Sequence, residues 1–420
     1  MKFIFGLLVC CTLMACQSTV GDAKNTAGVA ESVGFSSERL DRIAPVMQEY
    51  IDQGKLAGTL TLVARNGKVA YLNAQGMQDK EAGEPMREDT IFRIYSMSKP
   101  VTAVAAMTLW EQGKFHMFDP IAKYLPELAN MKVYVSGSGE NMVVEDAKTP
   151  IRIIDLFMHT SGFSYGFTGS EVDKLYQQML SKPDELNRGN ILAKFAELPL
   201  THQPGTAWNY GVSTDIIGFL VEKLSGKKLG EYMQETIFSP LGMEDTGFHV
   251  PANKVDRLTQ IYTADRKTGQ TIVMQNEPLG DFMSDPAIHN AGGGLVSTMQ
   301  DYFTFAQMML NGGEINGVRI LGRKTVEYMG TNHLPEHLVP FSEDSQGEGY
   351  GLAMSVTVDP GLSGFMSSKG NFGWGGAAST YFRVDPKEKI IIISMAQFIP
   401  MGFHRYHDDF RNLVYQALVD

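Results

Sequence analysis

The sequence predicts an α+β fold (α/β in the broad sense) in which one antiparallel sheet is assembled from both ends of the chain and flanked by helices. β-rich runs occupy residues 58–64 and 68–73 near the start, and residues 380–385 and 389–395 near the end. The region between them, about residues 116–285, has a mainly helical pattern. We therefore expect an inserted helical lobe, with a cleft between the lobes that suits a small molecule.

The first expected element is a helix that Ser36 or Ser37 can cap and that Gly54 ends. Its apolar face is spaced as one side of a helix requires, with Leu40, Ile43, Ala44, Met47 and Ile51. Asn66-Gly67 separates the first two β-rich runs. This dipeptide favours a turn that matches the twist of paired strands, so the two runs are expected to form a hairpin.

The C-terminal β-rich runs are joined by a turn at residues 386–388, and a final helix follows. The apolar positions of that helix are Phe410, Leu413, Val414, Ala417 and Leu418. Within the lobe, residues 214–224 and 228–237 have clear helical patterns. Elements from both termini would then pack as one domain, residues 35–420.

The first residues are expected to be a targeting segment outside the fold. Lys2 precedes an apolar stretch, residues 3–13, that is too short to cross a bilayer. Residues 13–16, Leu-Met-Ala-Cys, resemble a bacterial lipoprotein cleavage box. Residues 1–15 would be the signal peptide, and Cys16 the lipidated first residue of the mature chain. An ordinary signal peptide with an incidental cysteine is the alternative.

The predicted lipid anchor at Cys16 would attach the protein to the bacterial cell envelope. Gln17 stands where an aspartate would favour the inner membrane, which implies an outer-membrane anchor facing the periplasm. Residues 16–34 are small and polar and predict a flexible tether.

Charge and cysteine content exclude some functions. The net charge of −11 argues against a nucleic-acid partner, because the phosphate backbone requires a basic surface. The three cysteines, Cys10, Cys11 and Cys16, all lie in the leader region, so no disulfide is expected in the mature fold. The oligomeric state stays open.

A Ser-x-x-Lys pattern, Ser96 to Lys99, stands before a long apolar run at residues 101–110. A serine hydroxyl is a poor nucleophile at neutral pH and needs a base beside it. If a helix begins near Ser96, the two side chains lie one turn apart, and the helix dipole favours negative charge at the serine. Burial lowers the pKa of a lysine, which would let it accept a proton. The pattern alone is common by chance, and a helix cap with a solvated lysine is the alternative.

Further motifs in chain order resemble the serine β-lactamase and penicillin-binding-protein superfamily, more narrowly its class C-like branch with the family VIII carboxylesterases. They lie at residues 90–99, 113–126, 159–162, 204–210, 240–243, 291–295 and 373–376. The resemblance covers about residues 35–420. It implies a β-lactamase-like fold and acyl transfer through a covalent intermediate on Ser96, with no cofactor and no metal.

The resemblance implies a tyrosine base in the second motif, and Tyr210 occupies that position. Lys99 would be the cation that poises it. Which of the two is the resting base stays open, since their titrations would be coupled. β-Lactamases of this class have an amide residue two places after the tyrosine, where this chain has Val212, followed by Ser213. Val212 is therefore expected to line the substrate site. A loop tyrosine with a satisfied hydroxyl is the alternative.

The third motif of the family is matched by Trp374-Gly375-Gly376, where class C β-lactamases have Lys-Thr-Gly and family VIII esterases often have Trp-Gly-Gly. The resemblance implies that these three residues line the substrate on a strand. The backbone N–H groups of Ser96 and Ala377 would form the oxyanion hole. Trp374 lacks the charge with which a lysine recognises the carboxylate of a β-lactam, which favours neutral esters. Simple packing of Trp374 is the alternative.

Two other segments match known signatures by their letters alone. Residues 267–269, Lys-Thr-Gly, lie in a polar stretch that predicts a hairpin turn. Residues 162–166, Gly-Phe-Ser-Tyr-Gly, match a nucleophile elbow but lack the strand before it and the helix after it. An α/β-hydrolase scheme with Ser164 as nucleophile is therefore the runner-up.

These residues together predict a serine hydrolase that cleaves carboxylic esters of small substrates. A β-lactamase or D-amino-acid peptidase, which would cleave amides with the same groups, is the second interpretation. A non-catalytic cell-wall sensor is the third, and the joint presence of Ser96, Lys99 and Tyr210 counts against it.

Overall fold

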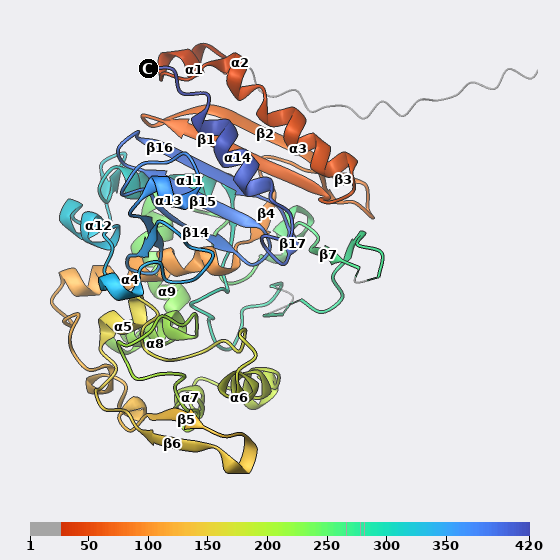
Figure 1. The fold of residues 1–420 in the computed structure, drawn as a ribbon. Coiled ribbons are helices and arrows are strands. Elements are labelled where there is room, and N and C mark those ends of the chain that lie inside the picture. The colour runs from red at the N-terminus through yellow and green to blue at the C-terminus, as the bar shows by residue number, and fades with distance from the viewer. Residues whose placement is uncertain (1–26, 266, 278, 281) are drawn as a thin grey trace, which may run out of the picture.

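The computed structural model describes residues 27–265, 267–277, 279–280 and 282–420. In this part of the chain, an antiparallel sheet of eight strands has the order β12-β13-β14-β15-β16-β1-β2-β3 (Figure 1). The strands are β1 (Gly58–Arg65), β2 (Lys68–Asp79), β3 (Glu84–Pro85), β12 (Glu348–Tyr350), β13 (Ser355–Thr357), β14 (Phe372–Gly376), β15 (Thr380–Asp385) and β16 (Ile390–Met395). The predicted fold class is confirmed.

The two ends of the chain meet in the middle of this sheet. Asn66 and Gly67 have φ values of 53° and 76°, which is the turn expected of this dipeptide, and they join β1 to β2. On its other side β1 pairs with β16, with Leu62 opposite Ile393. Strands from both termini therefore form one sheet.

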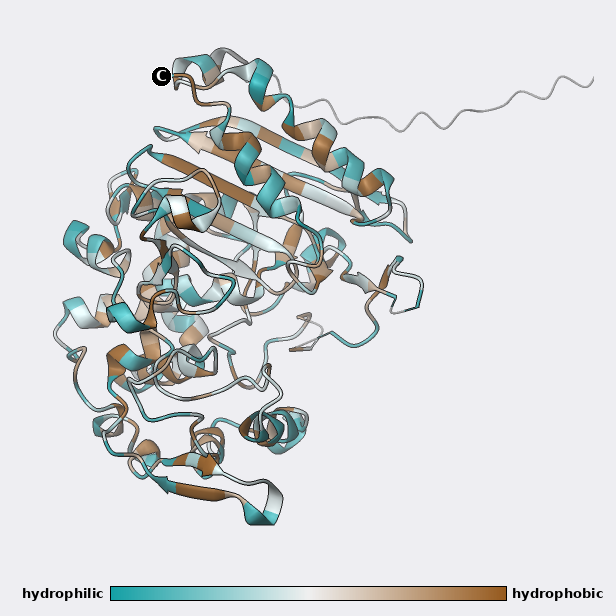
Figure 2. Cartoon of the chain, in the orientation of Figure 1, coloured by the Kyte–Doolittle hydropathy of each residue, from teal (hydrophilic) through white to brown (hydrophobic). Residues whose placement is uncertain are grey.

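Consecutive side chains of β16 face two different cores. Ile390 and Ile392 pack in one core, whereas Ile391, Ile393 and Met395 pack in the other. Side chains alternate along a strand, so a strand covered on both faces is apolar throughout. Figure 2 shows this central strand as a continuous hydrophobic band between the helices.

Helices cover both faces of the sheet. The helices α1 (Ala27–Ser32), α3 (Ile43–Asp52) and α14 (Tyr406–Tyr415) pack on one face, with α2 (Ser37–Leu40) beside them (Figure 1). On the other face α11 (Met299–Leu310) packs against β15 and β16, and α4 (Ser98–Glu111) lies in the same core. No helix in the described residues has both the length and the apolar character needed to span a membrane.

Two expectations near the N-terminus are corrected. The single helix predicted from Ser36 is two helices, α2 and α3, with a break after Leu40; Ser36 does cap the first, accepting the N–H of Arg39. The predicted tether, residues 16–34, overlaps α1, and Ala30 in this helix and Val33 just after it are buried. Their apolar contacts place residues 27–34 in the folded domain. The predicted signal peptide and Cys16 lie outside the described residues.

The inserted lobe is mainly helical, as expected, but it differs in two details. It contains α5 (Ile153–Phe157), α6 (Glu171–Leu180), α7 (Ile191–Glu197), α8 (Ser213–Ser225), α9 (Leu229–Met233) and α10 (Ser239–Leu241). It also has a hairpin of β5 (Lys132–Ser136) and β6 (Val143–Asp146). The lobe ends well before residue 285, since β7 (Tyr262–Ala264) and β8 (Thr271–Val273) form a sheet with β17 (Phe398–Ile399) near the C-terminus.

Smaller elements complete the molecule. β4 (Ile91–Arg93) pairs with β9 (Val296–Thr298), and β10 (Glu314–Ile315) pairs with β11 (Val318–Arg319). Two more helices are α12 (Arg323–Met329) and α13 (Pro360–Ser363).

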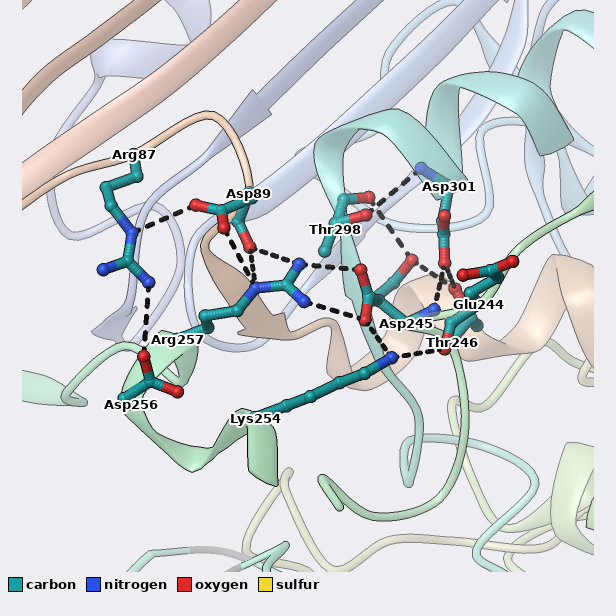
Figure 3. Close-up of polar contacts among 11 residues, drawn as sticks. Arg87, Asp89, Glu244, Asp245, Thr246, Lys254, Asp256, Arg257, Thr298 and Asp301 are labelled. Carbon is teal, nitrogen blue, oxygen red and sulfur yellow. Dashed lines mark hydrogen bonds and ion pairs between the residues drawn. The ribbon is translucent and has the colours of Figure 1, made fainter. Parts of the chain in front are cut away.

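A network of charged side chains ties the segment that leaves the helical lobe to the sheet domain (Figure 3). Asp245 is its centre. Both Asp245 oxygens accept from Arg257, at 3.0 and 2.7 Å, and one also accepts from Lys254 at 2.6 Å. Arg257 also donates to the Asp89 carbonyl just before β4, and the Asp245 N–H donates to Asp301 in α11. Asp245 thus links three parts of the chain, through its carboxylate to Arg257 and Lys254 and through its backbone N–H to Asp301.

Candidate active site

Ser96 lies in a short 3₁₀ turn, η1 (Tyr95–Met97), between β4 and the buried helix α4. The predicted α-helix therefore begins at Ser98, two residues later than Ser96. Tyr95 has a φ of +41°, which is uncommon for a residue with a side chain. Such backbone strain is typical of positions whose geometry the surroundings enforce. The turn presents Ser96 in front of the α4 N-terminus.

Lys99 is almost completely buried, with 1% of its surface exposed. Its Nζ donates hydrogen bonds to Ser96 Oγ at 3.2 Å and to the carbonyl of Gly292 at 2.6 Å. The alternative of a solvated lysine is therefore wrong. Lys99 is held within proton-transfer distance of the serine hydroxyl.

Asp215, in the first turn of α8, holds the Gly292 peptide whose carbonyl accepts from Lys99. This role was not predicted from the sequence. The Asp215 carboxylate accepts the N–H of Gly292 at 3.0 Å and the hydroxyl of Tyr165 at 2.7 Å. Burial raises the pKa of Asp215, and the charge of Lys99 opposes that rise. An acidic residue at the start of a helix is ordinary in a sequence, so it carried no signal of this role.

Tyr210 lies beside Lys99 as predicted. The Lys99 Nζ is 4.6 Å from the centre of the Tyr210 ring, and the Tyr210 hydroxyl accepts a hydrogen bond from Trp374 Nε1 at 3.2 Å. His159 also packs against the Tyr210 ring, with centroids 4.8 Å apart, and accepts the N–H of Gly211 at 3.4 Å. Burial holds the pKa of His159 well below its usual value, so this histidine is neutral and positions the tyrosine.

The third motif lies on β14, close to the nucleophile. A Cβ added to Gly376 would be 2.3 Å from the carbonyl oxygen of Ile94, two residues before Ser96. Glycine is required here because the strand and the backbone before the nucleophile approach so closely. Trp374, Gly375, Gly376 and Ala377 all line the same cleft as Ser96, Lys99 and Tyr210.

Val212 does not line the cleft, and this expectation is corrected. It is 2% exposed and packs in the core where α8 begins. Ser213 does not replace the missing amide either, because its hydroxyl is buried against the hydroxyl of Ser161 at 2.8 Å. Tyr165, rather than either of these residues, lines the cleft.

Both segments that match other signatures are structural. Ser164 is 1% exposed; its hydroxyl donates to Asp173 and accepts the N–H of Gly166. It follows helix α5 rather than a strand, so it is not a nucleophile elbow. Thr268 lies in the turn between β7 and β8, where its N–H and hydroxyl donate to Asp265.

The cleft has a volume of about 1090 Å³, enough for a small ligand. Its wall near Ser96 is aromatic, with Tyr165, Phe167, Tyr210 and Trp374. Among the described residues, no cluster of three or more histidine, cysteine or acidic side chains is arranged to hold a metal ion.

Comparison with known proteins gives the same assignment. The chain matches the family model described as Beta-lactamase over residues 43–416. An uncharacterised protein of Mycobacterium tuberculosis is 36% identical over 86% of this chain and 90% of its own. Esterase EstB of Burkholderia gladioli is 26% identical over 86% of this chain and 91% of its own.

Among solved structures, EstCE1, described as a hydrolase with promiscuous acyltransferase activity, superposes with a TM-score of 0.77. The match has 26% identity and covers 90% of this chain and 99% of that one. The chain therefore belongs to the β-lactamase family and is a serine hydrolase of the β-lactamase fold.

Proposed function

We propose that this protein cleaves carboxylic esters of small substrates through a covalent acyl-enzyme on Ser96. The observation that carries the proposal is the contact between Trp374 and Tyr210, 3.2 Å from Nε1 to the hydroxyl oxygen. This hydrogen bond places the uncharged indole of Trp374 at the third motif, in contact with Tyr210, the proposed base. The similarity to esterase EstB supports the same chemistry.

In the proposed mechanism Ser96 Oγ attacks the ester carbonyl carbon while its proton passes to the pair formed by Lys99 and Tyr210. Lys99 Nζ is the group hydrogen-bonded to Ser96 Oγ, at 3.2 Å, which supports it as the first acceptor. The backbone N–H groups of Ser96 and Ala377 would hold the oxyanion. Tyr210 returns a proton to the leaving alcohol, and water then hydrolyses the acyl-enzyme.

The decisive experiment compares the wild type, Ser96→Ala and Ser164→Ala on a short-chain nitrophenyl ester and on a chromogenic cephalosporin. Ser96→Ala should lower kcat on the ester by at least about 10³-fold, since the nucleophile is lost. Ser164→Ala is the matched control. It makes the same serine-to-alanine change at a buried serine outside the proposed catalytic groups, and it should stay active. Ester turnover that survives in Ser96→Ala refutes the assignment of the nucleophile.

The same assays separate ester from amide chemistry. Cephalosporin turnover that exceeds ester turnover would establish an amide hydrolase instead, since both reactions use the same acyl-enzyme. A wild type that turns over neither substrate would support the non-catalytic alternative.

We also propose that Cys16 anchors the protein to the outer membrane, facing the periplasm, on the evidence of the lipoprotein box alone. Fractionation of cells that produce the full chain tests this. The wild type should sediment with membranes and Cys16→Ser should be released; equal release of both contradicts the anchor.

A further inference from the structure

One wall of the cleft contains a buried guanidinium, that of Arg411 in α14. Arg411 is 7% exposed, and its carbon Cζ stacks on the ring of Phe365 at 3.5 Å. Nη1 donates to the hydroxyl of Tyr381 at 3.1 Å. One face and one donor of the guanidinium are thereby fixed, so its orientation is set before any ligand binds.

The remaining donors of this guanidinium have no partner in the described part of the protein. Nε is buried without a hydrogen bond, and no described residue accepts from Nη2. Nε and Nη2 form one edge of the guanidinium plane, and this is the edge that binds a carboxylate through two parallel hydrogen bonds. A buried N–H group without a hydrogen-bond acceptor costs free energy. An arginine kept in this state beside the cleft therefore points to a ligand that accepts the hydrogen bond.

The neighbouring charges do not neutralise Arg411. Glu348 pairs with Arg383 at 2.8 Å, and Asp408 pairs with Arg405 at 3.3 Å. His407, which adjoins Arg411 in the cleft wall, is neutral, because burial and the Arg411 charge lower its pKa to about 3. Asp344 is the other acidic residue of the cleft and is exposed to solvent. No described carboxylate lies within ion-pair distance of Arg411.

We infer that Arg411 binds an anionic group, a carboxylate, on the ester that Ser96 cleaves. The inference rests on the proposed ester hydrolysis and narrows its substrate class. The third motif has no cation, since Trp374 stands there. In this protein the positive charge for the substrate comes from the C-terminal helix instead. This anionic substrate class differs from the neutral esters that Trp374 alone favours.

The test measures kcat/KM on three nitrophenyl or aryl esters of similar size. One is neutral, 4-nitrophenyl butyrate; one has the carboxylate in the acyl part, mono-4-nitrophenyl glutarate; one has it in the leaving group, 4-acetoxybenzoate. The wild type should prefer one of the two anionic esters over the neutral ester. Arg411→Met should lower that preference, as the ratio of kcat/KM values, by about 10- to 100-fold.

Two further variants control for charge and folding. Arg42→Met removes the same charge from an exposed site between α2 and α3, and should leave the ratio unchanged. Arg411→Lys keeps the charge but loses the two-donor edge, so it should restore only part of the preference. Its partial rescue keeps the test valid if Arg411→Met folds poorly.

The outcomes separate the two proposals. Hydrolysis of the neutral ester with no preference for either anionic ester, or a preference that Arg411→Met leaves intact, overturns the role of Arg411 and leaves ester hydrolysis standing. Absence of any Ser96-dependent ester turnover overturns the proposed function itself. Competitive inhibition by glutarate gives a second readout: its Ki should rise in Arg411→Met and stay constant in Arg42→Met.

Discussion

At the scale of single residues, the side chains predicted to act together do lie together. Lys99 touches Ser96 and adjoins Tyr210, and all three open into one cleft. Asp215 was missed by sequence reasoning, and Gly292 was placed in a motif without a role; both act through long-range contacts. Gly292 presents its carbonyl to Lys99 across 193 positions of the chain. No spacing rule connects residues so far apart, because only the packing of α4 against α8 brings them into contact.

Replacement of Asp215 tests this support. Asp215→Asn should lower kcat by about 10- to 100-fold with a smaller change in KM, because Lys99 loses the carboxylate that fixes the Gly292 peptide. Steady-state kinetics measure both parameters.

Asp173→Asn is the control for that change. Asp173 is another buried carboxylate in the same lobe, hydrogen-bonded to Ser164 and Thr168 rather than to the candidate catalytic groups. It should lower the melting temperature and preserve kcat. Equal kinetic effects in the two variants would show that Asp215 has a purely structural role.

At the scale of elements, strong local signals predicted strands and helices well. The hairpin of β1 and β2, the limits of β15 and the position of α8 agree with the sequence patterns. The break between α2 and α3 and the late start of α4 were not predicted. In both places the chain adapts to packing: Leu40 and Ile43 are both buried on either side of the break. Local propensity is a weak guide where tertiary contacts decide the conformation.

Strand β14 gives a prediction at this scale. Gly376→Ala should displace β14 from the backbone before Ser96, because the added Cβ would meet the Ile94 carbonyl oxygen at 2.3 Å. We expect a loss of about 1–3 kcal/mol in the free energy of unfolding together with a large fall in kcat. Urea titration and ester kinetics measure them. Gly28→Ala in α1, where a Cβ meets no atom within 4 Å, is the matched control and should lower neither the free energy of unfolding nor kcat.

At the scale of the whole molecule, the sheet built from both termini serves as the platform, and the inserted lobe supplies the other wall of the cleft. Ser96 and Trp374 come from the sheet side, whereas Tyr165 and Tyr210 come from the lobe. The site therefore depends on how the two parts are held together. The network around Asp245 is one such connection, because it joins the end of the lobe to β4 and α11 (Figure 3).

Neutralising Asp245 should weaken this connection in a pH-dependent way. Hydrogen bonds from Arg257 and Lys254 outweigh the burial of Asp245 and hold its pKa below the usual value. A carboxylate with a lowered pKa stabilises the folded state above its unfolded pKa, about 3.9, and loses that effect as the pH falls through the folded pKa. Asp245→Asn should therefore cost about 1 kcal/mol at pH 7, the figure being reduced for solvent screening, and less at pH 2.

Urea unfolding at both pH values measures the difference. Glu327→Gln, which removes an exposed carboxylate of α12, should leave the midpoint at pH 7 unchanged. A cost of Asp245→Asn that does not fall at low pH would attribute the effect to altered packing rather than to the ion pairs.

The sequence by itself determined the fold class and indicated Ser96, Lys99 and Tyr210 as candidate catalytic residues, because local patterns and an ordered set of motifs carry that information along the chain. Only the tertiary structure decided which side chains face the cleft. Val212, expected in the cleft, packs in the core at the start of α8, and Tyr165, for which nothing was predicted, lines the cleft. The orientation of the Arg411 guanidinium is set by Phe365 and Tyr381, which only folding brings next to it. The burial of Arg411 and the absence of a described acceptor for its Nε result from tertiary packing, so a sequence pattern cannot predict them.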